Sequence, residues 1–186
     1  RLEETDLARL LQHAVERANQ VLLGYARRHP DEAGDMGSTL TLAVVEDERL
    51  TIAHVGDSRA YLWRDPELQQ LTEDHSVPGA LLKQGKITPD ELYDHPHRHV
   101  LYRCLGLKPN LEVDIYPAID LRPGDVLALC SDGLWDMVHP TERLIAMLSR
   151  GGDLLPMCHR LVDAANKAGG EDNVTVLLVR LEARDE

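Results

Sequence analysis

Phenylalanine is absent from this 186-residue chain, and only two tryptophans and five tyrosines supply aromatic rings. The hydrophobic residues make up 43% of the chain, so its core must be built mainly from aliphatic side chains. No apolar run approaches the roughly 18 residues of a membrane-spanning helix, and no signal-peptide pattern opens the sequence. We therefore expect no membrane insertion, and the length fits a single domain over residues 1–186.

Basic residues are also scarce. Twenty lysines and arginines stand against thirty-two acidic residues, which gives a formal net charge of −12. Such a surface repels the phosphates of nucleic acids and of anionic membranes, so neither is an expected partner. The same surface suits cations, although acidity can also serve solubility alone.

The three cysteines, Cys104, Cys130 and Cys158, are odd in number and form no CxxC pair. This argues against a disulfide framework and against a structural zinc site, and a reducing cytosol is the simplest setting. None of them is followed six positions later by arginine, which excludes a cysteine-dependent phosphatase.

Hydrophobic periodicity and turn residues predict the elements of secondary structure. The expected helices are 7–25, 77–84, one capped by Thr88, 141–148 and one capped by Asp153. The expected strands are 39–45, 50–55, 59–63, 69–72, 112–116, 126–130 and 174–181. The first four strands are expected to pair as an antiparallel meander, and the nearly continuous apolar run of the last predicts a central strand. Strand runs interrupted by helices favour an α+β layered sandwich.

Two aspartates lie where chemistry is expected. Asp132 follows directly on the apolar strand 126–130, and Asp172 comes just before the last strand. If these strands are antiparallel neighbours, the end of one and the start of the other share a sheet edge, so both carboxylates would face one pocket. The glycine after Asp132, Gly133, is expected to let the backbone turn sharply there.

Asp74, at the exit of another expected strand, is a third candidate. Three carboxylates at one rim would repel each other unless a cation neutralised them, and oxygen ligands alone favour Mg²⁺ or Mn²⁺. Paired ions of this kind hold a phosphate and activate a water as nucleophile, so no protein nucleophile would be needed. Taken singly, each aspartate is more typical of a turn or a cap, so the argument depends on reading the local motifs together.

Read in order, five local strings resemble the consecutive motifs of the bacterial metal-dependent protein phosphatases of type 2C. The strings are Met36-Gly37-Ser38-Thr39-Leu40, His54-Val55-Gly56-Asp57-Ser58-Arg59-Ala60, Leu71-Thr72-Glu73-Asp74-His75-Ser76, Cys130-Ser131-Asp132-Gly133-Leu134-Trp135-Asp136 and Gly170-Glu171-Asp172-Asn173-Val174-Thr175. Leu105-Gly106 and the stretch around His99 match the bacterial branch as well. The resemblance covers essentially the whole chain.

The resemblance implies a four-layer αββα sandwich of two antiparallel sheets flanked by helices. It also implies that Asp132 and Asp172 ligate the second of two catalytic Mn²⁺ or Mg²⁺ ions, and that Asp132 and Asp74 hold a third, weaker ion. Residues 77–99 correspond to a mobile flap, and Asp57 to a structural turn aspartate. The implied activity is hydrolysis of phosphoserine and phosphothreonine in proteins, in signalling opposite a Ser/Thr kinase.

The histidines admit other interpretations. His95, His97 and His99 alternate like a zinc cluster, but prolines and Arg98 interleave them, so a role on the flap surface or at a helix cap is favoured. A Ser-His-Asp hydrolase built on Ser58 and His75 lacks the Gly-x-Ser-x-Gly elbow of such enzymes. His54 and His75 are expected to make hydrogen bonds inside their turns.

Two motifs of the family are not found in the sequence. One is an early arginine that binds the substrate phosphate, and the other is the Asp-Gly-x-Gly-Gly string whose aspartate bridges the two catalytic ions. The chain is therefore expected to be part of a longer phosphatase and to be inactive by itself. The alternative is a catalytically inactive phosphatase-like module for binding or signalling.

Overall fold

The computed structural model describes residues 4–183. The chain divides into two compact units, which are described one at a time. The first comprises the chain up to residue 57 together with 74–120, and the second comprises 58–73 together with the chain from 121 onward. The chain therefore leaves the first unit after Asp57, returns at Asp74, and leaves it again after Asp120.

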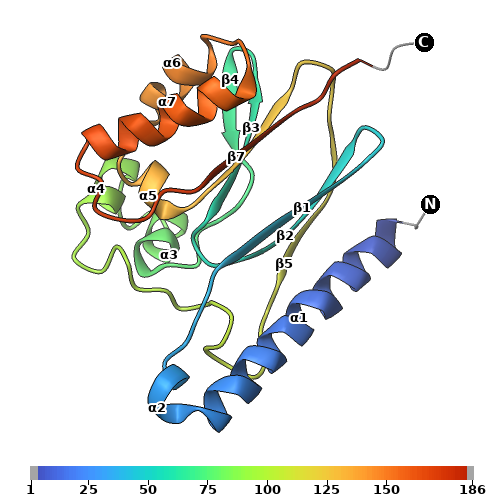
Figure 1. Cartoon of the computed structure of the whole chain (residues 1–186), viewed down its shortest axis with the longest axis vertical. Coiled ribbons are helices and arrows are strands. Elements are labelled where there is room, and N and C mark those ends of the chain that lie inside the picture. Colours follow the sequence, from blue (N-terminus) through green and yellow to red (C-terminus); the bar gives the residue numbers. More distant parts are fainter. Residues whose placement is uncertain (1–3, 184–186) are drawn as a thin grey trace. The chain divides into compact units, whose positions relative to one another are not determined.

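The first unit is a three-stranded antiparallel sheet with a long helix on it (Figure 1). Its strands are β1 (Leu40–Glu46), β2 (Arg49–Val55) and β5 (Asp114–Asp120), in the order β1-β2-β5. Its helices are α1 (Glu4–Arg28), α2 (Pro30–Ala33), α3 (Val77–Lys83) and α4 (Pro89–Tyr93). The long helix α1 packs on β2 and β5.

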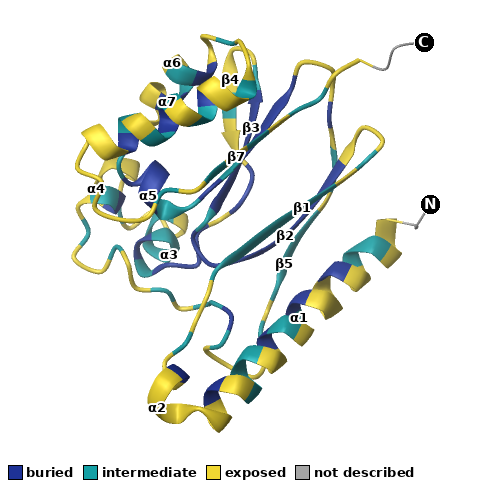
Figure 2. Cartoon of the chain, viewed as in Figure 1, coloured by how far each residue is buried: buried dark blue, intermediate teal, exposed yellow. Residues whose placement is uncertain are grey.

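The core of the first unit is aliphatic, as the composition requires. Leu11 and Val15 on one face of α1 pack with Ala53 and Val55 of β2, and with Leu105. Figure 2 shows buried and exposed residues alternating along α1, as expected for an amphipathic helix with one face on a sheet.

The second unit is a four-stranded antiparallel sheet with three helices. Its strands are β3 (Arg59–Arg64), β4 (Glu67–Gln70), β6 (Val126–Cys130) and β7 (Val176–Arg180), in the order β4-β3-β6-β7. Its helices are α5 (Asp132–Trp135), α6 (Thr141–Leu148) and α7 (Leu154–Lys167). Met157, Leu161 and Ala165 form the buried stripe of α7, which packs on β7.

The α+β fold with two antiparallel sheets and flanking helices is confirmed. The four-strand meander is wrong, because β2 and β3 belong to different sheets. The chain passes from one sheet to the other at Gly56, whose φ of +114° is a conformation that few other residues adopt. A turn signal in the sequence does not say whether the next strand pairs with the last one.

The prediction that the last strand is central is also wrong. Within the described residues β7 pairs only with β6 and lies at the edge of its sheet, with Leu177 50% and Val179 42% exposed. A continuous apolar run is typical of a strand that is buried on both faces. β7 has such a run, but one of its faces is exposed.

Two N-cap predictions have different outcomes. Thr88 forms a complete capping box with Glu91 at the start of α4, which confirms the first. Asp153 does precede α7, but its side chain makes no capping hydrogen bond, so the second is right in position only. Between residues 4 and 183, no helix is long and apolar enough to cross a membrane.

Candidate metal centre

The end of β6 and the start of β7 lie at one edge of the second sheet. The two strands are antiparallel neighbours, and Cys130 faces Val176 in the register. Asp132 lies two residues after Cys130, beyond the end of β6, and Asp172 lies four residues before Val176, ahead of the start of β7. The expected shared edge is therefore observed.

Ser131 joins the two segments beyond the last strand pair. Its N–H donates to the Thr175 carbonyl oxygen (3.1 Å), and its hydroxyl donates to the Asn173 carbonyl oxygen (3.1 Å). The same hydroxyl oxygen accepts from the Thr175 N–H (3.0 Å). Three hydrogen bonds thus hold the residue before Asp132 against the segment after Asp172.

Gly133 is needed here for a different reason than the expected turn. It is the second residue of α5 and has no left-handed φ. Any side chain at this position would collide with the Asn173 carbonyl group, and it would also come within 3.3 Å of the Asp172 carbonyl oxygen. The glycine lets the two aspartate-bearing segments approach each other closely.

A cation–π contact between Arg59 of β3 and Trp135 holds the short helix α5 against the sheet. The Arg59 guanidinium of β3 lies 3.6 Å from the ring centroid of Trp135 and donates to the Tyr61 hydroxyl (3.0 Å). Arg59 and Trp135 are both buried. A desolvated contact of this kind is worth about 2 kcal/mol, enough to hold the first turn of α5, and with it Asp132, in place.

Asp132 and Asp172 supply carboxylate oxygens at this edge, and both remain reachable from solvent. Asp132 is half-buried and Asp172 is exposed. In each, Oδ1 accepts the N–H of the next residue, at 2.9 Å for Gly133 and 2.6 Å for Asn173. Each carboxylate keeps its other oxygen, and such hard donors suit Mg²⁺ or Mn²⁺.

No group of three possible metal ligands occurs among the residues that the structure describes. The pair Asp132 and Asp172 fits part of an oxygen-ligated ion site, and the remaining ligands must come from water or from other groups. This arrangement is common for Mg²⁺, which keeps several waters.

Asp74 belongs to the first unit, whereas Asp132 and Asp172 belong to the second. It is buried, 7% exposed, and lies four residues after the end of β4. Its neighbour His75 is 2% exposed and is part of the main polar network of this unit.

His75 and Gly56 are joined by two hydrogen bonds. The His75 N–H donates to the Gly56 carbonyl oxygen (2.7 Å), and the Gly56 N–H donates to Nδ1 of His75 (3.0 Å). Nδ1 must be unprotonated to accept, so the proton of the neutral ring lies on Nε2. His54 also contacts the Gly56 carbonyl oxygen (3.0 Å), and its Nδ1 lies 2.9 Å from the Thr41 hydroxyl.

On its other side, Nε2 of His75 lies 3.0 Å from Oδ2 of Asp114, and the Arg103 guanidinium donates to Oδ1 of the same carboxylate (2.6 Å). Burial lowers the pKa of His75, and the Arg103 charge lowers it further, against the opposing effect of Asp114. Burial would raise the pKa of Asp114, but His75 and Arg103 outweigh it and hold that pKa below its usual value. At neutral pH the contact is therefore a hydrogen bond from a neutral imidazole to a carboxylate.

The histidines near residue 97 form no zinc cluster in the described chain. The His97 N–H donates to Nδ1 of His95 (3.1 Å), and the two rings lie 5.8 Å apart. None of the three cysteines forms a disulfide, and burial raises the pKa of the Cys104 thiol.

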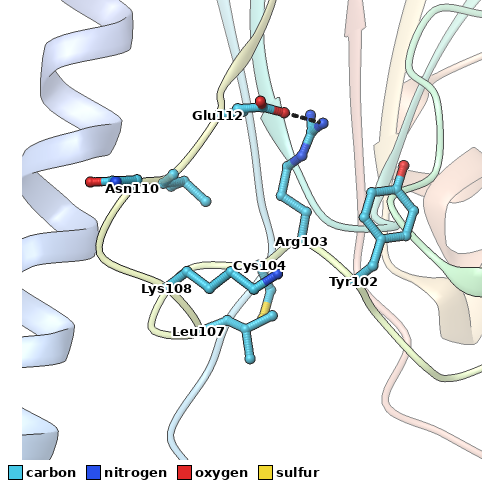
Figure 3. A pocket seen from close by; sticks show the side chains of 8 residues that line it. Tyr102, Arg103, Cys104, Leu107, Lys108, Asn110 and Glu112 are labelled. Atoms are coloured by element: carbon cyan, nitrogen blue, oxygen red, sulfur yellow. Dashed lines mark hydrogen bonds and ion pairs between the residues drawn. The ribbon is translucent and has the colours of Figure 1, made fainter.

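Cys104 also lines a cavity of about 340 Å³ together with Tyr102, Arg103 and Lys108 (Figure 3). The cavity lies beside the Arg103 network and contains none of the three predicted metal ligands.

Sequence reasoning missed the supporting residues. Ser131 lies in the motif that contains Asp132, but the motif gives it no structural role, and no motif points to Arg103 or Asp114. Asp114 did carry a signal, because it is a carboxylate between the apolar residues Val113 and Ile115 at the start of β5, where an unpaired charge is costly. Its partners come from residues 11 and 39 positions away, which spacing alone does not reveal.

Comparison with known proteins identifies two family models, which match successive parts of the chain. Residues 2–79 match the family model described as Protein phosphatase 2C, and residues 86–182 match the model of Stage II sporulation protein E (SpoIIE). The serine/threonine phosphatase stp of Listeria monocytogenes is 40% identical over 169 residues, which are 91% of this chain and 66% of the relative. PstP of Mycobacterium tuberculosis, a serine/threonine protein phosphatase, is 38% identical over 176 residues, or 93% of this chain and 33% of its own. The chain thus spans just under two thirds of the first relative and a third of the second.

Two solved structures extend the similarity to the fold. The crystal structure of the serine/threonine phosphatase Stp1 from Staphylococcus aureus is 30% identical, covers 98% of this chain and 71% of its own, and has a TM-score of 0.90. The catalytic domain of PstP in complex with two manganese ions is 35% identical, with coverages of 96% and 73% and a TM-score of 0.85. With identities of 30% and 35% over more than two thirds of these two chains, the protein belongs to the protein phosphatase 2C family.

Proposed function

We propose that this chain forms the metal-binding part of a protein serine/threonine phosphatase that hydrolyses phosphoserine and phosphothreonine. The observation that carries the proposal is the joined edge of β6 and β7, where Ser131 and Gly133 hold the segments of Asp132 and Asp172 side by side. Family membership and the two carboxylates at this edge support the same chemistry.

Asp132 and Asp172 would each give a carboxylate oxygen to a divalent ion at this edge. When bound, paired ions hold the substrate phosphate and make a water nucleophilic. The protein's part is to keep the two carboxylates close despite their repulsion, through the hydrogen bonds of Ser131 and the anchoring of α5 by Arg59. Solvent access at this edge lets a phosphorylated side chain approach.

The preferred ions are Mn²⁺ or Mg²⁺, because the proposed ligands are oxygens only. The PstP catalytic domain with two manganese ions supports a pair of ions. Asp74, which is 7% exposed, is proposed as a ligand of a further, weaker ion.

The proposed substrates are phosphoproteins made by a Ser/Thr kinase, so the protein would act in signal transduction. The relatives named as serine/threonine phosphatases support this class of substrate. A cytoplasmic setting is part of the proposal, and the three free thiols are consistent with a reducing compartment.

The test measures Mn²⁺ binding and phosphatase activity in Asp132→Ala, Asp172→Ala and the control Asp163→Ala. Asp163 is an exposed aspartate of α7 in the same unit, so the control removes one negative charge from the same surface. Binding is measured by isothermal titration on this chain. Activity on a phosphothreonine peptide is measured on this chain and on a form extended by the family's two upstream motifs.

Either site variant should weaken Mn²⁺ binding at least tenfold, and in the active form it should lower kcat by a hundredfold or more. Asp163→Ala should change neither by more than twofold. Unchanged Mn²⁺ binding in both site variants would refute the assignment. Tight Mn²⁺ binding without turnover in the extended form would favour the inactive binding module.

A further inference from the structure

Arg103, Asp114 and His75 form a chain of contacts in the first unit that ends at Gly56. Gly56 is the residue before Asp57, and His75 is the residue after Asp74. We propose that these three residues are a positioning triad, which holds the two acidic turns of the first unit in register so that Asp74 can serve as a metal ligand. The metal role of Asp74 rests on the proposed function, but the positioning of Gly56 and His75 is testable without it.

The triad lies at the point where the chain leaves the first unit and returns to it. Residues 58–73 belong to the second unit, so Gly56 and His75 flank the two ends of this excursion. Two hydrogen bonds join them directly, through the His75 N–H and its Nδ1. A shift of the imidazole would break one of the two bonds and move Asp57 relative to Asp74.

The direction of the hydrogen bonds explains why Asp114 is required. Nδ1 can accept from Gly56 only while the ring proton lies on Nε2, and Asp114 is the acceptor for that proton. Without the carboxylate, Nε2–H would lose its acceptor in a buried position, where an unpaired donor is unfavourable. Nη1 of Arg103 lies 3.1 Å from Nε2 and can donate to it only if the ring proton moves to Nδ1, and Gly56 would then lose its acceptor.

Arg103 holds the carboxylate in turn. It donates to Asp114 (2.6 Å) and to Glu112 (2.8 Å), as Figure 3 shows for the second contact. The backbone before it is tied to the same turn, since the Tyr102 N–H donates to the His75 carbonyl oxygen (3.0 Å). The guanidinium, the carboxylate and the imidazole are therefore fixed from several sides.

A second arginine–aspartate pair offers a matched comparison. In the second unit, Arg64 donates to both oxygens of Asp125 at 2.9 and 2.6 Å, and Asp125 also accepts the Arg122 N–H (2.8 Å). This pair has the same chemistry, and the hydrogen-bond partners of its carboxylate are Arg64 and Arg122 instead of a histidine. Loss of either aspartate should destabilise the protein, but only loss of Asp114 should affect His75 and Gly56.

The experiment compares Asp114→Ala, Asp114→Asn and Asp125→Ala. In the 186-residue chain, the ring ¹⁵N shifts of His75 report its tautomer, and hydrogen exchange reports protection of the Gly56 amide. Asp114→Ala should lose the Nε2–H tautomer and speed Gly56 exchange at least tenfold. Asp114→Asn keeps an acceptor oxygen and should recover most of the protection.

The phosphatase activity of the same variants is measured in the form extended by the two upstream motifs, with the phosphothreonine peptide as substrate. Asp114→Ala should lower kcat about tenfold or more while the KM for the peptide stays within twofold, and Asp125→Ala should leave kcat within twofold. The proposal is overturned if Asp114→Ala leaves Gly56 exchange within twofold of wild type, or if Asp125→Ala speeds it equally. Absence of turnover in the wild-type extended form would refute the proposed function, and the exchange data would still decide the positioning role.

Discussion

Close packing at a single backbone position, Gly133, allows the segments that carry Asp132 and Asp172 to approach each other. The chain at Gly133 passes so near the Asn173 carbonyl group that no side chain fits between them. The cost of a methyl group there cannot be relieved by a side-chain rotation, because the opposing atoms are backbone. The substitution must either displace the start of α5 or push residues 172–173 away.

Gly133→Ala should therefore destabilise the protein by about 2 kcal/mol, in the range typical of overpacking. Gly24→Ala is the matched control, since Gly24 lies inside α1 and a Cβ there meets no atom within 4 Å. Alanine is the better helix former, so the control should be neutral or stabilising by up to about 1 kcal/mol. Urea unfolding of the two variants measures the difference, and equal stabilities would contradict the close approach.

Asp125 gives the protein a stability that depends on pH. Burial would raise the pKa of Asp125, but the hydrogen bonds and charge of Arg64 and the Arg122 N–H outweigh it, so the pKa lies below its usual value. A depressed carboxyl pKa contributes stability above the unfolded value of about 3.9, and that contribution is lost as the pH falls through the folded value.

Asp125→Asn should cost about 2 kcal/mol at pH 7, because a hydrogen-bonded charge is removed from a nearly buried site. The difference in free energy of unfolding between wild type and variant should become smaller as the pH is lowered from 6 toward 3. Denaturant unfolding at several pH values measures this difference. A difference that grows on acidification would show that the sign is wrong.

At the scale of single helices, the two N-cap positions show what local sequence predicts well. Thr88 and Glu91 are three residues apart, so their reciprocal hydrogen bonds depend on local geometry alone and the capping box could be expected. Asp153 occupies the correct position, but its side chain makes no capping bond. Its rotamer depends on surroundings that the neighbouring residues do not determine.

Thr88→Ala should remove the hydrogen bonds of the Thr88 hydroxyl with the Glu91 N–H and the Glu91 carboxylate, and cost α4 about 1 kcal/mol of local stability. Asp153→Ala should cost α7 less than about half of that, through its charge near the helix start alone. Hydrogen exchange at the Glu91 and Met157 amides reports each helix start separately. Equal acceleration in the two variants would mean that the Thr88 bonds contribute nothing specific.

The strands show where sequence reasoning stops. The ranges of β2, β3 and β6 follow from their own residues, and the shared edge of Asp132 and Asp172 follows from an antiparallel pairing of β6 with β7. The change of sheet at Gly56 and the edge position of β7 could not be predicted from local sequence, because they depend on which strands pair at long range. The same limit hid Asp114, whose partners lie far away in the chain.

For the whole molecule, the predicted metal ligands are distributed over both compact units. Asp132 and Asp172 lie together in the second unit, while Asp74 and its positioning triad lie in the first. An ion that depends on the first two carboxylates should stabilise the second unit directly. Binding to the folded state adds RT ln(1 + [L]/Kd), about 2.7 kcal/mol at a ligand concentration of a hundred times Kd.

Saturating Mn²⁺ should therefore raise the Tm of the chain, and a chelator should reverse the shift. Asp172→Ala should abolish most of it, because the remaining carboxylate of Asp132 is too weak a ligand alone. The gain in hydrogen-exchange protection should concentrate in 130–136 and 172–176, where the Ser131 hydrogen bonds already join the two segments. If the gain appears instead around His95 and His97, the bound ion is held by the histidines and the carboxylate edge is not the metal centre.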